Sequence, residues 1–208
     1  MQNASLDSAT AEFYKHYAEH GAIAAEAPRS AISAYFGPAF RAGDKVLDVG
    51  AGSGRDLAVL CKAGFDAYGI EPNDSMRTFA LQNHPDLAAR LQPGSLPDIG
   101  LPFGGQFDGV VCSAVMMHVP EEQLAASWES IRSVLKPNGR VLISLPFMRP
   151  GLLKNDRDND GRFFTNHSPA FIDSLLKPLG FHRIDLGAGA MAQYADVTWT
   201  IFLLELSA

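Results

Sequence analysis

The fold of this chain of 208 residues is decided by one stretch, Lys45-Val46-Leu47-Asp48-Val49-Gly50-Ala51-Gly52-Ser53-Gly54. Its first half is an apolar run of strand length, and its second half places three glycines at alternate positions. The following residues, Arg55 to Lys62, are good helix formers. A strand, a glycine turn and a helix in this order predict a ligand-binding loop, because glycine allows a tight turn and a helix start offers unpaired N–H groups.

Strand-like and helix-like segments alternate after this loop. Apolar runs predict strands at Ala67–Ile70, Phe107–Ser113 and Arg140–Leu145. Apolar residues at helical spacing predict helices at Asp74–Gln82 and Glu121–Leu135. This alternation favours a parallel sheet with helical crossovers.

The C-terminal third departs from that rhythm. Residues 136–139 have the composition of a turn, and residues 146–166 form a long polar loop of the kind that often serves as a lid. A helix is expected over Ser168–Pro178, followed by strands at Phe181–Leu186 and Val197–Leu206. Because no helix separates these last two strands, we expect them to pair antiparallel.

Composition bounds the class of protein. Apolar residues make up 47% and charged residues 19%, which is ordinary for a globular chain of this length. We expect one domain over residues 1–208, with an N-terminal helical cap at 1–42 and a core at 43–208 that carries the 146–166 loop as an insertion.

Charge and targeting signals point to a cytoplasmic protein that binds neither nucleic acid nor membrane. The formal net charge of −6 provides no basic field for a phosphate backbone. The first ten residues lack the pattern of a secretory signal, and no window has the length and apolarity of a membrane span. Cys61 and Cys112 both lie in apolar segments, so we expect buried thiols, no disulfide and no metal site.

Two acidic residues accompany the glycine loop. Asp48 lies two residues before the first glycine, where its carboxylate can hold loop N–H groups or receive the amino group of an amino-acid ligand. Glu71 ends the second strand, 17 residues after Gly54, where it can accept hydrogen bonds from two ribose hydroxyls. Loop and acids together predict a nucleoside-containing ligand.

The motifs resemble those of class I S-adenosylmethionine-dependent methyltransferases, in the family's order. Val46–Gly54 resembles the first motif, Tyr68–Met76 the second, Phe107–Ser113 the fourth, and Leu135–Val141 the turn before strand five. The segment Phe164–Phe181 also resembles the family's late helix and strand. The resemblance implies an α/β, Rossmann-like, doubly wound sheet of seven strands, mostly parallel with an antiparallel last strand.

The same resemblance implies an enzyme that transfers a methyl group from S-adenosylmethionine to a small-molecule acceptor, with S-adenosylhomocysteine as product. The implied cofactor-binding residues comprise the glycine loop and its acid, the ribose acid, the adenine pocket and one residue after strand four: Asp48, Gly50, Gly52, Gly54, Glu71, Pro72, Met76, Ser95, Leu96 and Ser113. At the adenine pocket the family usually has an acid, where this chain has a hydroxyl at Ser95 and an apolar side chain at Leu96.

Three side chains are candidates for the acceptor end of the site. His118 follows strand four at the edge of the sheet where ligands collect, and it is the candidate general base. Tyr14 and Tyr17 lie on an N-terminal helix that we expect to close over the ligands. Arg149, Arg157 and Arg162 of the long loop could meet an anionic acceptor, but a run of charges is usually a solvated face, so they are assigned no role.

Three other functions remain as alternatives. A nicotinamide-dependent oxidoreductase would use the same sheet, but its Gly-x-Gly-x-x-Gly fingerprint needs a third glycine where this chain has Arg55. A non-catalytic S-adenosylmethionine-binding regulator would carry the same motifs as an enzyme. Nucleic-acid methylation commonly uses an Asn/Asp-Pro-Pro-aromatic motif after strand four, where this chain has Cys112-Ser113-Ala114-Val115. Acceptor, methylated atom and oligomeric state stay open at this point.

Overall fold

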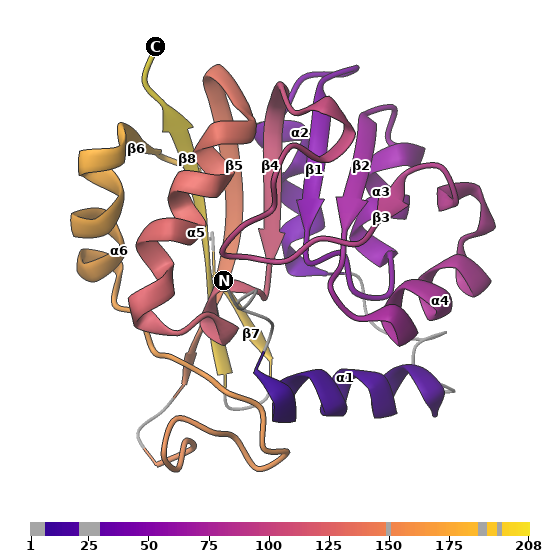
Figure 1. Ribbon diagram of the computed structural model, residues 1–208. Coiled ribbons are helices and arrows are strands. Elements are labelled where there is room, and N and C mark those ends of the chain that lie inside the picture. The colour runs from indigo at the N-terminus through magenta and orange to yellow at the C-terminus, as the bar shows by residue number, and fades with distance from the viewer. Residues whose placement is uncertain (1–6, 21–29, 149–150, 187–190, 195–196) are drawn as a thin grey trace.

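The computed structural model describes residues 7–20, 30–148, 151–186, 191–194 and 197–208. One sheet with the strand order β3-β2-β1-β4-β5-β8-β6 runs through it (Figure 1). The strands on this path are β1 (Lys45–Val49), β2 (Asp66–Ile70), β3 (Leu91–Gln92), β4 (Phe107–Ser113), β5 (Leu135–Met148), β6 (Phe181–Ile184) and β8 (Val197–Leu206). A short strand off this path, β7 (Met191–Tyr194), pairs with β8.

Strand directions confirm the predicted sheet. β1 is parallel to β2 and β4, β2 is parallel to β3, and β4 is parallel to β5. β8 runs antiparallel to both β5 and β6, as expected for consecutive strands without an intervening helix. The order reverses at β1, so the ends of β1 and β4 form the switch point where such sheets bind ligands.

Helices cover both faces of the sheet, which makes it doubly wound (Figure 1). The α-helices are α1 (Ser8–Glu19), α2 (Phe36–Ala39), α3 (Arg55–Lys62), α4 (Asp74–Asn83), α5 (Glu121–Val134) and α6 (Pro169–Leu176). Single 3₁₀ turns are η2 (Ala31–Tyr35), η3 (Pro85–Leu87), η4 (Pro102–Gly104), η5 (Met116–His118) and η6 (Lys177–Leu179).

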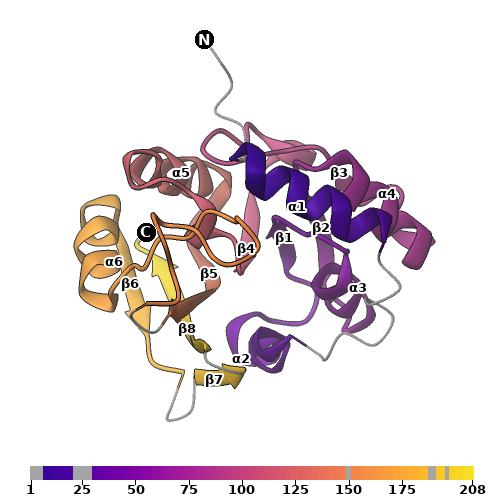
Figure 2. The same cartoon turned by 90° about the horizontal axis from the view of Figure 1, so that it is seen from below.

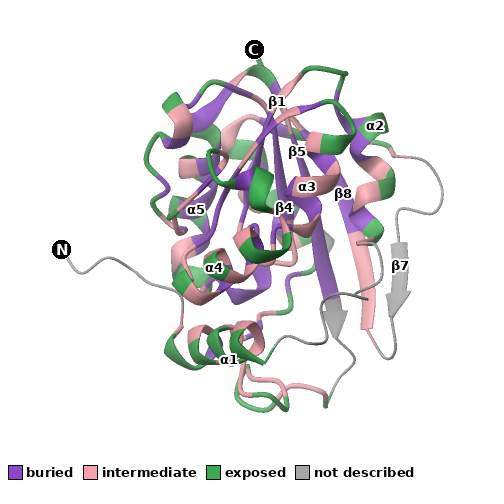
Figure 3. Ribbon diagram, turned by 90° about the vertical axis from the view of Figure 1, so that its right-hand side faces the viewer, coloured by how far each residue is buried: buried purple, intermediate pink, exposed green. Residues whose placement is uncertain are grey.

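Alternate residues of the central strands feed two hydrophobic clusters. Leu47 and Val110 point into the cluster that includes α5 and α6, whereas Val46 and Val111 point into the cluster that includes η2, α2 and α3. This two-residue alternation follows from strand geometry. The strands are accordingly buried on both faces, and exposed residues concentrate on the outer sides of the helices (Figure 3).

α1 lies across the carboxyl ends of β1 and β2, away from both helical layers (Figures 1 and 2). It packs against α4, and the segment from residue 151 to 167 runs beside its N-terminal end. The helices of the first forty residues do not form one unit, because η2 and α2 contribute Ile32 and Phe36 to the core. Of the described helices in the predicted N-terminal cap, α1 covers the ligand-binding edge, whereas η2 and α2 pack into the core.

Three differences from the sequence predictions concern β5, β7 and Cys61. The turn composition at 136–139 falls inside β5, where Phe107 pairs with Leu135 but Gly109 pairs with Arg140, so the extra residues form a bulge. β7 was not expected, because its four residues carry no separate strand signal. Cys112 is fully buried as predicted, but Cys61 is only half-buried.

The helix predictions at Asp74–Gln82 and Glu121–Leu135 are confirmed to within one residue by α4 and α5. The side chain of Asn73 caps α4 by accepting hydrogen bonds from the backbone N–H groups of Ser75 and Met76. In the described part of the chain, no helix is long and apolar enough to cross a membrane.

Candidate active site

A cavity of about 270 Å³ opens at the carboxyl ends of β1, β2 and β4, beneath α1. Twelve of the thirteen site residues predicted from the sequence line this cavity: Tyr14, Tyr17, Asp48, Gly50, Gly52, Glu71, Pro72, Met76, Ser95, Leu96, Ser113 and His118. They come from five separate segments of the chain. The fold therefore brings together the predicted cofactor residues and the predicted acceptor residues in one place.

Gly54 is the thirteenth residue and lies outside the cavity lining. It has a φ of +75° at the start of α3, and a Cβ atom there would lie 3.1 Å from a Leu87 methyl and 3.2 Å from Ala80. Its absent side chain thus allows α3 to approach α4 and η3 closely. The structure explains this glycine by packing instead of ligand contact.

Position 50, at the first turn of the loop, requires glycine because neighbouring atoms leave no room for a side chain. Its φ is +72°, and a Cβ atom would lie 2.5 Å from Cγ2 of Val115. The N–H groups of Gly50 and Ala51 both donate to the carbonyl of Ile70, at 2.8 and 2.9 Å, which ties the loop to the end of β2. The loop is held in place before any ligand arrives.

Asp48 is a buried carboxyl group of the site with one oxygen that lacks a hydrogen-bond partner among the described residues. Its side chain is 1% exposed, and within the described residues its Oδ2 atom has no hydrogen-bond partner. Burial raises the pKa of this carboxyl well above its usual value, and the nearby carboxylates of Asp56 and Glu71 raise it further. A buried oxygen of this kind is a ready acceptor for a cationic donor.

Glu71 connects the glycine loop to α4 and, indirectly, to α1. Its Oε2 accepts a hydrogen bond from the Gly52 N–H and its Oε1 accepts one from the Asn73 N–H, both at 2.9 Å. Asn73 in turn donates through Nδ2 to the carbonyl of Ala11 on α1, at 2.9 Å. Burial raises the pKa of Glu71, while the two backbone hydrogen bonds lower it.

The side chains predicted to surround adenine lie farther along the same wall. Pro72 and Met76 come from the start of α4, and Ser95 and Leu96 follow β3. The Ser95 hydroxyl donates to the carbonyl of Leu96 at 2.9 Å. The Ser95 oxygen can therefore still accept a hydrogen bond, at the position where class I methyltransferases usually carry an acid.

His118 ends η5 and is buried, with 5% of its surface exposed. Its Nδ1 lies 2.6 Å from the carbonyl oxygen of Phe163, and its Nε2 lies 3.1 Å from the hydroxyl of Tyr14. Because a carbonyl can only accept, Nδ1 carries the proton and Nε2 accepts a hydrogen bond from Tyr14. Burial lowers the pKa of His118 to about 4, so the ring is neutral at neutral pH.

Tyr14 contributes its hydroxyl from α1, and its ring meets His118 edge to face at a centroid distance of 5.8 Å. Burial raises the pKa of the Tyr14 phenol, while the charge of Arg162 and a hydrogen bond to it lower this pKa. Tyr17 lines the cavity one turn farther along the helix and is half-buried. Both tyrosines therefore lie where the sequence analysis expected a lid.

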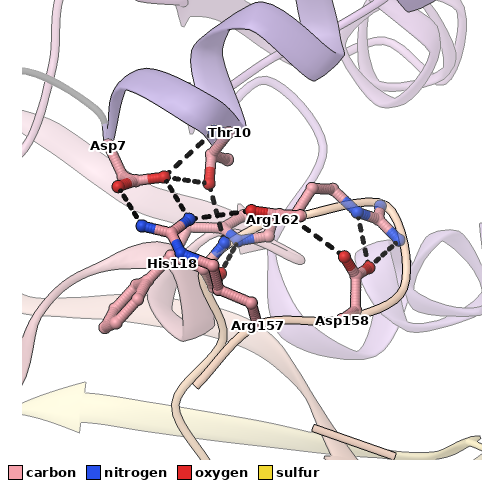
Figure 4. Close-up of polar contacts among 8 residues, drawn as sticks. Asp7, Thr10, His118, Arg157, Asp158 and Arg162 are labelled. Carbon is pink, nitrogen blue, oxygen red and sulfur yellow. Dashed lines mark hydrogen bonds and ion pairs between the residues drawn. The ribbon is translucent and has the colours of Figure 1, made fainter. Parts of the chain in front are cut away.

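Asp7, Thr10, Arg157 and Arg162 were not predicted as site residues. The loop arginines were interpreted as a solvated face without a role, but the two described ones both make ion pairs. Arg157 donates to both carboxylate oxygens of Asp7, each at 2.9 Å (Figure 4). Arg162 pairs with Asp158 and lies over the rings of Phe13 and Phe164, at 4.5 and 5.2 Å from their centroids. Arg149 lies outside the described residues. Asp7 and Arg157 are 150 positions apart, so no local pattern revealed that ion pair.

The comparisons with known proteins agree with this geometry. A family model described as a methyltransferase domain matches residues 14–182. The chain is 31% identical over 150 residues to a protein-L-isoaspartate O-methyltransferase of Methylorubrum extorquens, an alignment that covers 68% of this chain and 60% of that protein. It is also 31% identical over 106 residues to a ubiquinone biosynthesis O-methyltransferase of Acinetobacter baylyi, covering 50% of this chain and 44% of the relative.

A solved structure shares the fold. The 1,6-didemethyltoxoflavin-N1-methyltransferase of Burkholderia thailandensis, solved with 1,6-didemethyltoxoflavin and S-adenosylhomocysteine bound, superimposes with a TM-score of 0.72. The match covers 96% of this chain and 87% of that one at 18% sequence identity. The chain belongs to the methyltransferase domain family, and the resemblance to class I S-adenosylmethionine-dependent methyltransferases is confirmed.

Proposed function

We propose that the chain transfers a methyl group from S-adenosylmethionine to a hydroxyl group of a small molecule. One observation carries this proposal: a single cavity joins the glycine loop, Asp48 and Glu71 to the hydrogen-bonded pair of Tyr14 and His118. Membership of the methyltransferase family supports it, and both relatives described above are named O-methyltransferases.

The cavity fits the cofactor in charge and in donor chemistry. Four carboxylates, Asp7, Asp48, Asp56 and Glu71, line it, against one cationic side chain among its described lining residues, Arg55. When bound, S-adenosylmethionine supplies a methyl group on a positively charged sulfur, together with an ammonium group. The unpartnered Oδ2 of Asp48 would receive that ammonium group.

The remaining cofactor contacts are assigned by the resemblance. Glu71 would accept hydrogen bonds from the ribose hydroxyls, and Pro72, Met76, Ser95 and Leu96 would surround the adenine ring. Gly50 and Gly52 would border the methionine part, and Ser113 would lie between that part and the acceptor. All of these residues line the cavity, which is the geometric support for the assignment.

Tyr14 and His118 would remove the acceptor's proton. The acceptor hydroxyl would donate to the Tyr14 oxygen while Tyr14 donates to Nε2 of His118, so that a proton can pass between them. A base with a pKa of about 4 is sufficient for oxygen, because a hydroxyl becomes strongly acidic as its oxygen loses electron density to a new bond. An amine loses its proton less readily at that stage, which favours a hydroxyl acceptor.

α1 has the role of a lid in this proposal. Tyr14 and Tyr17 cover the cavity from a helix that lies outside the sheet, and water excluded beneath them strengthens the electrostatic contacts of the site. We also propose that residues 1–208 act as one domain on a small acceptor and not on nucleic acid. The cytoplasmic location stays a prediction.

An acceptor screen tests the function. The protein is incubated with S-adenosylmethionine and a library of small hydroxyl compounds, each paired with its amine counterpart, and S-adenosylhomocysteine is measured. We expect product only when a hydroxyl acceptor is present, and a decrease in kcat of about 10²- to 10⁴-fold in His118→Gln. His182→Gln, at an exposed histidine of β6, is the matched control and should keep full activity.

Two outcomes would contradict the proposal. Stoichiometric binding of S-adenosylmethionine without product across the library would favour a regulator that senses the cofactor. Turnover of amines in preference to hydroxyls would show that the acceptor assignment is wrong while leaving methyl transfer intact.

A further inference from the structure

A hydrogen-bonded path connects α1 to His118 through the backbone of Phe163. It begins at Thr10, which is fully buried on α1. The Thr10 hydroxyl donates to Oδ2 of Asp7 at 2.9 Å and accepts from the backbone N–H of Phe163 at 2.8 Å. The carbonyl of the same Phe163 then accepts the Nδ1 proton of His118 at 2.6 Å.

A second attachment holds the loop against the same end of α1. The guanidinium of Arg157 binds both oxygens of Asp7 and also donates to the carbonyl of Gly161 at 2.7 Å (Figure 4). Arg157 and Phe163 form an antiparallel bridge, so the ion pair and the hydrogen-bond path belong to one folded unit of the loop. Asp7 takes part in both the hydrogen-bond path and the ion pair, because it accepts from the Thr10 hydroxyl and from the Arg157 guanidinium.

The tautomer of His118 depends on this unit. An isolated imidazole can carry its proton on either nitrogen, and the hydrogen bond made by one nitrogen decides which lone pair the other presents. Here the Phe163 carbonyl holds the proton on Nδ1, and Tyr14 from the docked α1 meets the lone pair of Nε2. Arg162, Asp158 and Asp7 are the charged groups that face the ring.

We infer that Thr10 and the Asp7–Arg157 ion pair are positioning residues for His118: only when α1 docks on the loop is His118 fixed as the Nδ1–H tautomer, with Nε2 directed to the acceptor end of the cavity. Closing the lid and preparing the base are then the same event. The assignment of His118 as the base rests on the proposed function, but the dependence of its tautomer on Thr10 does not.

Nitrogen NMR of the free protein, labelled with ¹⁵N-histidine, tests this directly. Ring nitrogens with and without a proton have distinct shifts, and the His118 signals are assigned by their loss in His118→Gln. We expect the Nδ1–H tautomer in the wild type and in Thr10→Ser, which keeps the hydroxyl. In Thr10→Val, which keeps the shape and removes the hydroxyl, we expect a mixture in which Nε2–H becomes a major form.

Controls separate positioning from a general loss of structure. Ser127 of α5 is also fully buried, and its hydroxyl donates to the carbonyl of Gln123 at 2.8 Å, so Ser127→Ala removes a buried hydroxyl outside the path. This variant should keep the wild-type tautomer. If Thr10→Val does not fold, Arg157→Gln, at a half-exposed side chain, should produce the same shift toward Nε2–H.

An unchanged Nδ1–H tautomer in both folded Thr10→Val and folded Arg157→Gln would overturn the inference, as would an Nε2–H tautomer in the wild type. These outcomes are independent of methyl transfer, since no cofactor or acceptor is added. A protein that shows the expected tautomer shift and yet fails the acceptor screen would refute the function and leave the positioning intact.

Discussion

Arg157 binds both carboxylate oxygens of Asp7, each at 2.9 Å, across 150 positions of sequence. Asp7 also caps α1 by accepting from the Thr10 N–H at 3.0 Å. One side chain thus begins the helix over the site and holds the loop beside it. The Arg157 hydrogen bonds hold the pKa of Asp7 well below its ordinary 3.8, so the stabilisation is present above that pH and is lost as the pH falls further.

Removing the ion pair should release the lid without unfolding the protein. In Asp7→Asn the side-chain oxygen still caps α1 but the charge is lost, and we expect a loss of less than about 1 kcal/mol in unfolding free energy. Hydrogen–deuterium exchange should become faster in both α1 and residues 151–164. Glu205→Gln, which breaks a comparably exposed ion pair with Arg140 at the other end of the sheet, should leave exchange in those segments unchanged. Equal protection in Asp7→Asn and wild type would show that the ion pair does not hold the lid.

The ionised Asp48 carboxylate should destabilise the folded protein and strengthen the binding of S-adenosylmethionine. Since its folded pKa is raised, the protonated form stabilises the fold, and stability falls as the pH rises from 3.8 toward the raised value. Asp48→Asn removes this charge, so we expect a higher Tm at pH 7 and at least a tenfold weaker binding of S-adenosylmethionine. Differential scanning calorimetry and titration calorimetry measure the two effects. A lower Tm together with unchanged binding would contradict the role given to Asp48.

Most strands and helices could be predicted from the sequence, because the patterns that indicate them lie within short segments of the chain. The strand Lys45–Val49, the glycines and the helix after them predicted β1, the loop and α3, and apolar runs predicted β4 and β8 with their observed bounds. The bulge in β5 did not follow, because turn-forming residues predict a reversal of the chain, whereas pairing with β4 on one side and β8 on the other keeps it in the sheet.

The cavity-lining residues were predictable where they are tied to strand ends. Asp48, Glu71 and His118 each lie at or after the carboxyl end of a strand, so their meeting follows from the topology of a parallel sheet. Thr10 and Phe163 meet through the path of a long loop, which no periodicity encodes. The charged character of that loop suggested solvent, although Arg157 and Arg162 are in ion pairs and Phe164 is buried.

A side chain at position 50 should destabilise the fold by colliding with Val115, and Gly64 serves as a control that has no such neighbour. Gly64 also has a positive φ, +90°, but nothing lies within 4 Å of the position of its Cβ. Gly64→Ala should therefore cost only the backbone strain, about 1–2 kcal/mol. Gly50→Ala adds the collision with Val115 and should cost about 1–3 kcal/mol more in chemical denaturation. Val115→Ala in the same chain should recover part of that difference; equal costs at the two glycines would contradict the packing account.

His118 should make the protein sensitive to acid. Its folded pKa of about 4 lies below the ordinary 6.5, so stability is complete above pH 6.5 and falls as the pH drops toward 4. The loss should amount to about 3 kcal/mol, from roughly 1.4 kcal/mol for each pKa unit. Urea unfolding at pH 7 and pH 4 should show a smaller difference for His118→Gln than for the wild type. The pKa of His167 is also lowered by burial, but it is present in both proteins. An equal difference in both would show that His118 does not carry the effect.

Calorimetric titration with S-adenosylmethionine and S-adenosylhomocysteine, beside NADH, tests the central claim most directly. We predict micromolar binding of the first two by the wild type and loss of that binding in Glu71→Ala. Glu122→Ala, at an exposed acid of α5, should bind as the wild type does. Binding of NADH alone, or equal binding of S-adenosylmethionine by wild type and Glu71→Ala, would contradict the assignment of this cavity as a methyl-donor site.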